Sequence, residues 1–261
     1  MASIRVVAAE ARSAPAPAPP ARGEPAEAAW VLHADRWLLV AAKPAGCPTH
    51  PVRGDRARSM LSELSVRAGQ TLHAVHRLDR ATSGVVILAK DPDTAEALSA
   101  QFRHRTIDKR YVAWTRGHPP EFGVLDHPVP DRKRGRRVPA RTAFARHFVH
   151  GRYALVEVSP HTGRLHQIRR HLKHMRCPIL GDVRYGKGEH NRWARAELGL
   201  WRLALHAHRL RFVHPVDGAE WEARWAVPSD LRDPLARWAP HAVEALPSEA
   251  QKGFRCGPRH G

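Results

Sequence analysis

Apolar positions along the chain gather into short runs and helical stripes between about residue 30 and residue 238. The run Val85-Val86-Ile87-Leu88-Ala89 is continuous, which is typical of a buried strand. The stretches 59–68 and 92–105 repeat apolar residues every three or four positions, which predicts helices. Further strands are predicted at 30–33, 37–42, 109–114, 141–149, 153–159, 202–213 and 219–227, and further helices at 164–175 and 228–238.

The pattern weakens towards both ends of the chain. Residues 1–28 are mainly alanine, proline, arginine and glutamate and contain no aromatic residue, so they cannot bury enough apolar surface to offset the entropy of ordering. We therefore expect a disordered Ala/Pro-rich tail at 1–28, a single domain at 29–240 and a disordered basic tail at 241–261. Prolines interrupt residues 117–140, where the basic run 132–137 is either a solvated loop or a contact for phosphate groups.

The net charge of the chain indicates which class of molecule it binds. The chain has 43 lysine and arginine residues against 25 aspartate and glutamate residues, a formal net charge of +18, which favours a nucleic-acid partner. No apolar run of about 18 residues occurs, so we expect no membrane span. The three widely spaced cysteines, Cys47, Cys177 and Cys256, predict a reducing cytoplasm and no disulfide framework.

The most unusual polar stretch is 76–84, HRLDRATSG, directly before the buried run. It places the carboxylate of Asp79 between Arg77 and Arg80, and nearby positive charge keeps a carboxylate ionised. An ionised carboxylate suits a nucleophile better than a general acid. The alternative is a surface ion pair or turn cap, and the spacing alone leaves both interpretations open.

A second polar stretch lies on the helix predicted at 164–175. Leu165, Ile168, Leu172 and Met175 share one face, with Arg169 at its edge, so this guanidinium is expected to be half buried and to need an acidic or phosphate partner. The helix lacks an H-E-x-x-H pattern and a nearby cysteine pair, so no metal site is predicted for its three histidines, His166, His171 and His174. Arg170 and Lys173 are expected to point to solvent, and a Gly-rich polar loop is predicted over 185–192.

Taken in order, the segments HRLDRATSG, KRY (109–111), HTGRLHQIRRH (161–171) and CPILGD (177–182) resemble the signature segments of the RluA-type pseudouridine synthases. The resemblance covers about residues 31 to 227 and includes KPAG at 43–46. It implies an α+β pseudouridine synthase fold, with a mixed, mainly antiparallel central sheet, flanking helices and loops, and a catalytic cleft across the sheet. The chain is most similar to the TruC branch, whose members modify uridine 65 of transfer RNA.

The resemblance also implies a reaction and its residues. Uracil is detached from its ribose, turned and rejoined through carbon, without a cofactor. Asp79 matches the nucleophile, Tyr111 the tyrosine that stacks on the base and helps to remove its proton, and Arg169 the arginine that pairs with the catalytic acid. The residues expected to contact substrate are Arg77, Arg80, Thr82, Arg164, His166 and Ile168.

Three functions remain open at this point. The first is a tRNA pseudouridine synthase, the second a 23S ribosomal RNA synthase of the same family, and the third a non-catalytic RNA-binding protein or RNA-folding helper. A non-catalytic relative is expected to lose Asp79 or Tyr111, and both are present. We expect a cytoplasmic monomer that acts on RNA, and the loop 130–140 is a candidate for setting the choice of RNA.

Overall fold

The computed structural model describes residues 31–51, 59–131 and 135–246, so the predicted tail at 1–28 and most of that at 241–261 lie outside the described residues. The strands are β1 (Val31–Ala34), β2 (Leu38–Lys43), β3 (His73–Ala74), β4 (Ser83–Ala89), β5 (Asp108–Arg116), β6 (Phe122–Asp126), β7 (Val129–Pro130), β8 (Arg137–Val138), β9 (Arg141–His150), β10 (Tyr153–Pro160), β11 (Leu205–Val213) and β12 (Glu220–Arg224). The helices are α1 (Met60–Arg67), α2 (Pro92–His104), α3 (Gln167–His174), α4 (Gly188–Leu198), α5 (Ser229–Trp238) and the 3-10 helix η1 (Pro240–Val243).

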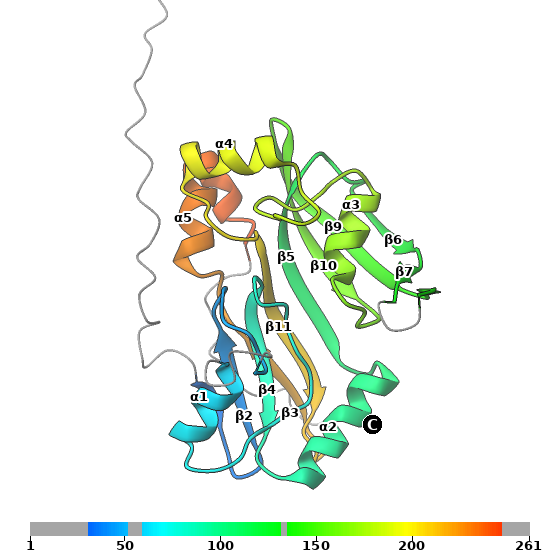
Figure 1. The fold of residues 1–261 in the computed structure, drawn as a ribbon, viewed down its shortest axis with the longest axis vertical. Coiled ribbons are helices and arrows are strands. Elements are labelled where there is room, and N and C mark those ends of the chain that lie inside the picture. Colours follow the sequence, from blue (N-terminus) through cyan, green and yellow to red (C-terminus); the bar gives the residue numbers. More distant parts are fainter. Residues whose placement is uncertain (1–30, 52–58, 132–134, 247–261) are drawn as a thin grey trace, which may run out of the picture.

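One ten-stranded sheet runs through the molecule (Figure 1). Its strands follow the order β1-β2-β4-β11-β5-β10-β9-β6, with β3 beside β4 and β12 beside β11, while β7 and β8 form a separate ribbon. Among the described strands, β4 and β11 pair in parallel and the other neighbours pair antiparallel. The predicted α+β fold with a mixed, mainly antiparallel sheet is confirmed.

The continuous apolar run forms β4, and every one of its residues is buried. Successive side chains on a strand point to opposite faces, so the run must be covered on both sides. Val86 and Leu88 pack in a cluster with Met60 and Leu64 of α1. Their neighbours Val85 and Ile87 pack in another cluster with Leu98 of α2. The second half of the sheet, around β5 and β10, packs against α3, α4 and α5.

Two local predictions are corrected by the structure. The Gly-rich loop predicted over 185–192 is in part the start of α4, and α3 begins at Gln167 rather than at 164. Within the proline-rich stretch 117–140, three short strands form, β6, β7 and β8, and 132–134 lie outside the described residues. After α5, the chain forms η1, and Ala242 of η1 is fully buried.

Within the described part of the chain, no helix is both long and apolar enough to cross a membrane.

Candidate active site

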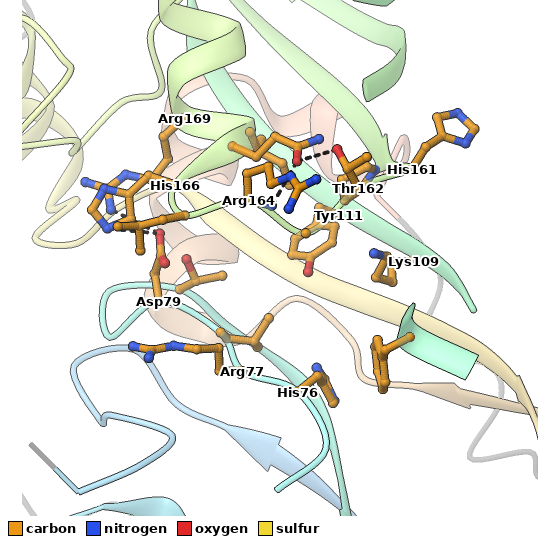
Figure 2. A pocket seen from close by; sticks show the side chains of 18 of the residues that line it. His76, Arg77, Asp79, Lys109, Tyr111, His161, Thr162, Arg164, His166 and Arg169 are labelled. Carbon is orange, nitrogen blue, oxygen red and sulfur yellow. Dashed lines mark hydrogen bonds and ion pairs between the residues drawn. The ribbon is translucent and has the colours of Figure 1, made fainter. Parts of the chain in front are cut away.

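A cleft of about 1090 Å³ lies over the middle of the sheet. Residues 75–79 and Thr82 line one side, and 160–169 line the other. Between them, β5 contributes Lys109 and Tyr111, and β11 contributes Leu205. Figure 2 shows Asp79 and Arg77 on one side, Arg164, His166 and Arg169 on the other, and Tyr111 between them. The stretches that the sequence singled out separately thus meet in one place.

Asp79 is held at the start of a tight turn. The amide of Thr82 donates to the Asp79 carbonyl at 3.0 Å, and the Thr82 side chain is buried beneath the turn. Two residues later, Gly84 adopts a φ of +146° where β4 meets β11, and a Cβ atom there would lie 2.3 Å from the Ala207 Cβ. This glycine therefore allows the close approach of β4 to β11 directly after the turn.

A buried lysine supports the same turn from below. Lys43 Nζ donates to the carbonyls of Pro44, Cys47 and Arg80 at 2.9, 2.7 and 3.3 Å. Burial lowers the pKa of Lys43 to about 7. The Gly46 amide also donates to the Arg80 carbonyl at 2.8 Å, and Arg80 Nε donates to the Gly46 carbonyl at 2.8 Å. The KPAG segment is thus tied to the Asp79 turn by hydrogen bonds in both directions.

Arg169 lies between two carboxylates. Its Nε and Nη2 atoms donate to Oδ2 and Oδ1 of Asp182, both at 2.8 Å, and its Nη1 donates to Asp79 Oδ2 at 3.1 Å. The Asp182 side chain is fully buried, whereas that of Asp79 is 21% exposed. Burial alone would raise the pKa of Asp182, but hydrogen bonds from Arg169 and from the amides of Tyr185 and Arg184 lower it below its ordinary value. Asp79 is therefore the partner of Arg169 that an incoming molecule can reach.

Tyr111 projects from β5 and packs against the core clusters on both sides of the cleft. Burial, and then the negative charge of Asp79, raise the pKa of its phenol well above the ordinary value. The phenol is therefore protonated at neutral pH. An aromatic face and a carboxylate next to each other can hold a planar base and attack a carbon attached to it.

A family model described as RNA pseudouridylate synthase matches residues 37–174. The chain belongs to the RNA pseudouridylate synthase family. The matched segment contains Asp79, Tyr111 and Arg169 together. The enzymes of this family are isomerases, so this pseudouridine synthase is one too.

Individual relatives point the same way. The pseudouridine synthase is 35% identical to tRNA pseudouridine synthase C of Pasteurella multocida over 209 residues, which are 71% of this chain and 86% of that protein. It is 36% identical to the enzyme of that name from Salmonella typhimurium over 211 residues, or 72% and 81% of the two chains. The match to that of Pectobacterium carotovorum, 35% identical over 224 residues, covers 75% of this chain and 60% of that protein.

A solved structure extends the likeness to three dimensions. Human RNA pseudouridylate synthase domain containing 4 is 30% identical, with a TM-score of 0.66 over 80% of this chain and 92% of that one.

The predicted substrate-binding residues of this pseudouridine synthase fall into two groups. Five of them line the cleft: Arg77, Thr82, Arg164, His166 and Ile168. Arg77 and Arg164 are exposed, while Ile168 is buried in the core cluster around β5 and β10. Arg80 is not among the lining residues, because its side chain turns away to the Gly46 carbonyl.

Sequence reasoning gave no role to three residues that contact the site: Lys43, Asp182 and Tyr185. Lys43 lies in the KPAG segment and Asp182 in CPILGD, but spacing does not distinguish a buried partner from an exposed one. Arg170, expected to point to solvent, donates to the Tyr185 hydroxyl at 3.1 Å and to the Pro130 carbonyl at 2.8 Å. Within 31–51, 59–131 and 135–246, no group of three or more His, Cys, Asp or Glu side chains is placed to hold a metal ion.

Proposed function

We propose that this protein is a tRNA pseudouridine synthase that acts at uridine 65. The support for tRNA as the substrate is the likeness to tRNA pseudouridine synthase C of several bacteria over more than 70% of the chain. The observation that carries the chemistry is the Asp79 carboxylate, reachable in the cleft and 3.1 Å from a buried arginine. The position of the uridine is inferred from the sequence resemblance to the TruC branch.

In the proposed reaction, one oxygen of Asp79 bonds to the ribose C1′ while the bond from C1′ to N1 of uracil breaks. The electron pair of that bond leaves on the uracil. After the base turns, its C5 bonds to C1′ and the bond to Asp79 breaks, which restores the carboxylate. Loss of the C5 proton and gain of a proton at N1 complete an isomerisation with no net change in atoms, and no cofactor takes part.

The other side chains prepare this step. Arg169 donates a hydrogen bond to the carboxylate and so orients it before the base arrives. Tyr111 stacks on the uracil and takes part in removing the C5 proton. Because its phenol is protonated, it can accept that proton only by passing its own proton on. Ile168 forms an apolar surface beneath the base, and Thr82 and His166 complete the walls of the cleft.

The uridine must leave a base-paired helix to reach this cleft. Unstacking a base requires a few kcal/mol, which stacking on Tyr111 and contacts between Arg77 or Arg164 and phosphates would offset. Arg80, although its side chain bonds to Gly46, is exposed at the edge of the same turn. A monomeric state, a cytoplasmic location and a role for the loop 130–140 in substrate choice stay predictions.

The direct test is to map pseudouridine in all RNA from cells with and without the gene. We expect the loss of pseudouridine at position 65 of tRNA, restored by the parent gene and by Asp233→Asn, a matched change at an exposed position of α5. Asp79→Asn is expected to bind tRNA but not to restore the modification. Loss of a ribosomal pseudouridine instead would favour a 23S ribosomal RNA synthase. Full activity of Asp79→Asn would overturn the assignment of Asp79 as the nucleophile.

A further inference from the structure

His166 stands directly before α3 in an unusual backbone conformation. Its φ is +53°, in the left-handed region that residues other than glycine seldom occupy. This conformation places the imidazole between two partners. Nε2 lies 3.8 Å from Asp79 Oδ2, and Nδ1 lies 3.0 Å from the Tyr185 hydroxyl. A strained residue next to the proposed nucleophile suggests a functional reason for the strain.

Tyr185 contacts both groups that face Asp79. Its hydroxyl meets His166, and the centre of its ring lies 5.1 Å from Arg169 Cζ, within the range of a cation–π interaction. Tyr185 is not among the residues that line the cleft. Within the described part of the chain, its side chain is linked to Asp79 through these two neighbours.

The hydrogen bonds fix where the protons lie. Arg170 Nε can only donate, so the Tyr185 oxygen accepts from it at 3.1 Å and the hydroxyl proton remains free for His166 Nδ1. Burial lowers the pKa of His166, and the charge of Asp79 only partly opposes this, so the imidazole is neutral at neutral pH. A neutral ring whose Nδ1 accepts a hydrogen bond carries its proton on Nε2. That N–H faces Asp79 Oδ2.

Arg169 and His166 both face the same carboxylate oxygen of Asp79. Arg169 Nη1 and His166 Nε2 each approach Oδ2, and no described residue donates a hydrogen bond to Oδ1. We propose that Tyr185 is a positioning residue, which fixes the His166 tautomer and supports Arg169 so that Oδ1 of Asp79 is the oxygen that reacts with the ribose. This inference rests on the proposed role of Asp79.

The structure offers a matched control for removing the Tyr185 hydroxyl. Tyr153 makes the same kind of bond, from its hydroxyl to His190 Nδ1 at 2.9 Å, but between β10 and α4 and outside the cleft. Tyr185→Phe and Tyr153→Phe each remove one tyrosine–histidine hydrogen bond and keep the ring.

In single-turnover assays on tRNA, we expect Tyr185→Phe to lower the rate of pseudouridine formation on the order of tenfold, equivalent to ~1.4 kcal/mol in the barrier. The Kd for tRNA is expected to stay within about twofold of that of the parent. Tyr153→Phe is expected to keep the parent rate, even where the two variants lose similar thermal stability.

A second variant tests whether Tyr185 acts through His166. His166→Asn keeps a residue that tolerates the left-handed conformation but is too short to reach Asp79. If the two side chains act as a unit, the double variant is no slower than the slower single variant. A parent-like rate for Tyr185→Phe, a loss confined to tRNA binding, or additive losses in the double variant would each overturn the proposal. Failure of the proposed function is distinguishable, because then the parent itself forms no pseudouridine in tRNA or Asp79→Asn remains active.

Discussion

At the scale of single residues, the carboxylates of Asp182 and Asp79 both bind Arg169 but differ in burial. Removing the guanidinium of Arg169 from water is favourable only when its charge and its N–H groups are satisfied. Asp182, fully buried and bonded through two oxygens, meets most of that requirement. Asp79 makes one longer contact and stays partly exposed. The carboxylate that stabilises the fold is therefore not the carboxylate that faces the substrate.

The phenol of Tyr111 can be tested separately from its ring. Tyr111→Phe preserves the stacking surface and removes the hydroxyl that we propose helps to take the C5 proton. Because general acid–base catalysis typically contributes at least 10²-fold, we expect about a hundredfold slower formation of pseudouridine with an unchanged Kd for tRNA. Single-turnover rates and filter binding on one RNA preparation measure the two quantities. A rate equal to that of the parent would reduce Tyr111 to a stacking surface.

At the scale of elements, periodicity predicted those segments whose buried residues are apolar. The strand β4 follows from an unbroken apolar run and the helix α2 from apolar residues at helical spacing, and Asp91 caps α2 by accepting from the Thr94 amide. The helix α4 was missed because its buried side includes His190 and Asn191, which are satisfied by hydrogen bonds to Tyr153, Gly181 and Asp182. A polar residue that is buried with its partners looks the same in sequence as one in a loop.

The start of α3 was misplaced for a related reason. The side chain of Gln167 accepts from the Arg164 amide at 3.0 Å and from the Thr162 hydroxyl at 2.6 Å. These bonds hold 162–167 as a turn in front of the helix, and the left-handed His166 lies within that turn. The resemblance of the sequence motifs was enough to predict that Asp79, Tyr111 and Arg169 belong to one site. The tautomer of His166 and the hydrogen bonds of Lys43 and Asp182 could be assigned only from the structure.

The connection between β2 and the Asp79 turn gives a prediction on pH. With a folded pKa of about 7, Lys43 loses its proton on folding between that pH and about 10.4, the pKa of an unfolded lysine. The unfolded chain binds more protons in this window, so the contribution of Lys43 makes the free energy of unfolding rise with pH, by at most about 1.4 kcal/mol per unit. Urea unfolding from pH 7 to pH 10 is expected to show this rise in the parent and to lack it in Lys43→Met. An equal slope in both proteins would contradict it.

At the scale of the whole molecule, the chain carries a net charge of +18, and exposed arginines line the cleft from opposite sides. Arg77 belongs to the Asp79 turn, and Arg164 precedes α3 and donates to the Pro139 carbonyl at 3.2 Å. A folded RNA laid across the sheet would meet both. Phosphate contacts hold such a substrate without reading its sequence, so the charge accounts for affinity, and the choice of uridine must come from shape and from contacts to the base.

If the chain neutralises six or more phosphates, tRNA affinity is expected to fall on the order of 10³-fold or more between 50 and 200 mM salt, by the rule for duplex DNA. Arg164→Ala is expected to make the slope of log K against log salt about one unit shallower, because it removes one contact from the cleft wall. Arg67→Ala, an exposed arginine of α1 outside the cleft, removes the same charge from the chain. If net charge alone governs binding, the two variants shift the slope equally. If the phosphates follow the cleft, as we expect, only Arg164→Ala changes it, and the difference between the two slopes locates the RNA backbone beside Asp79.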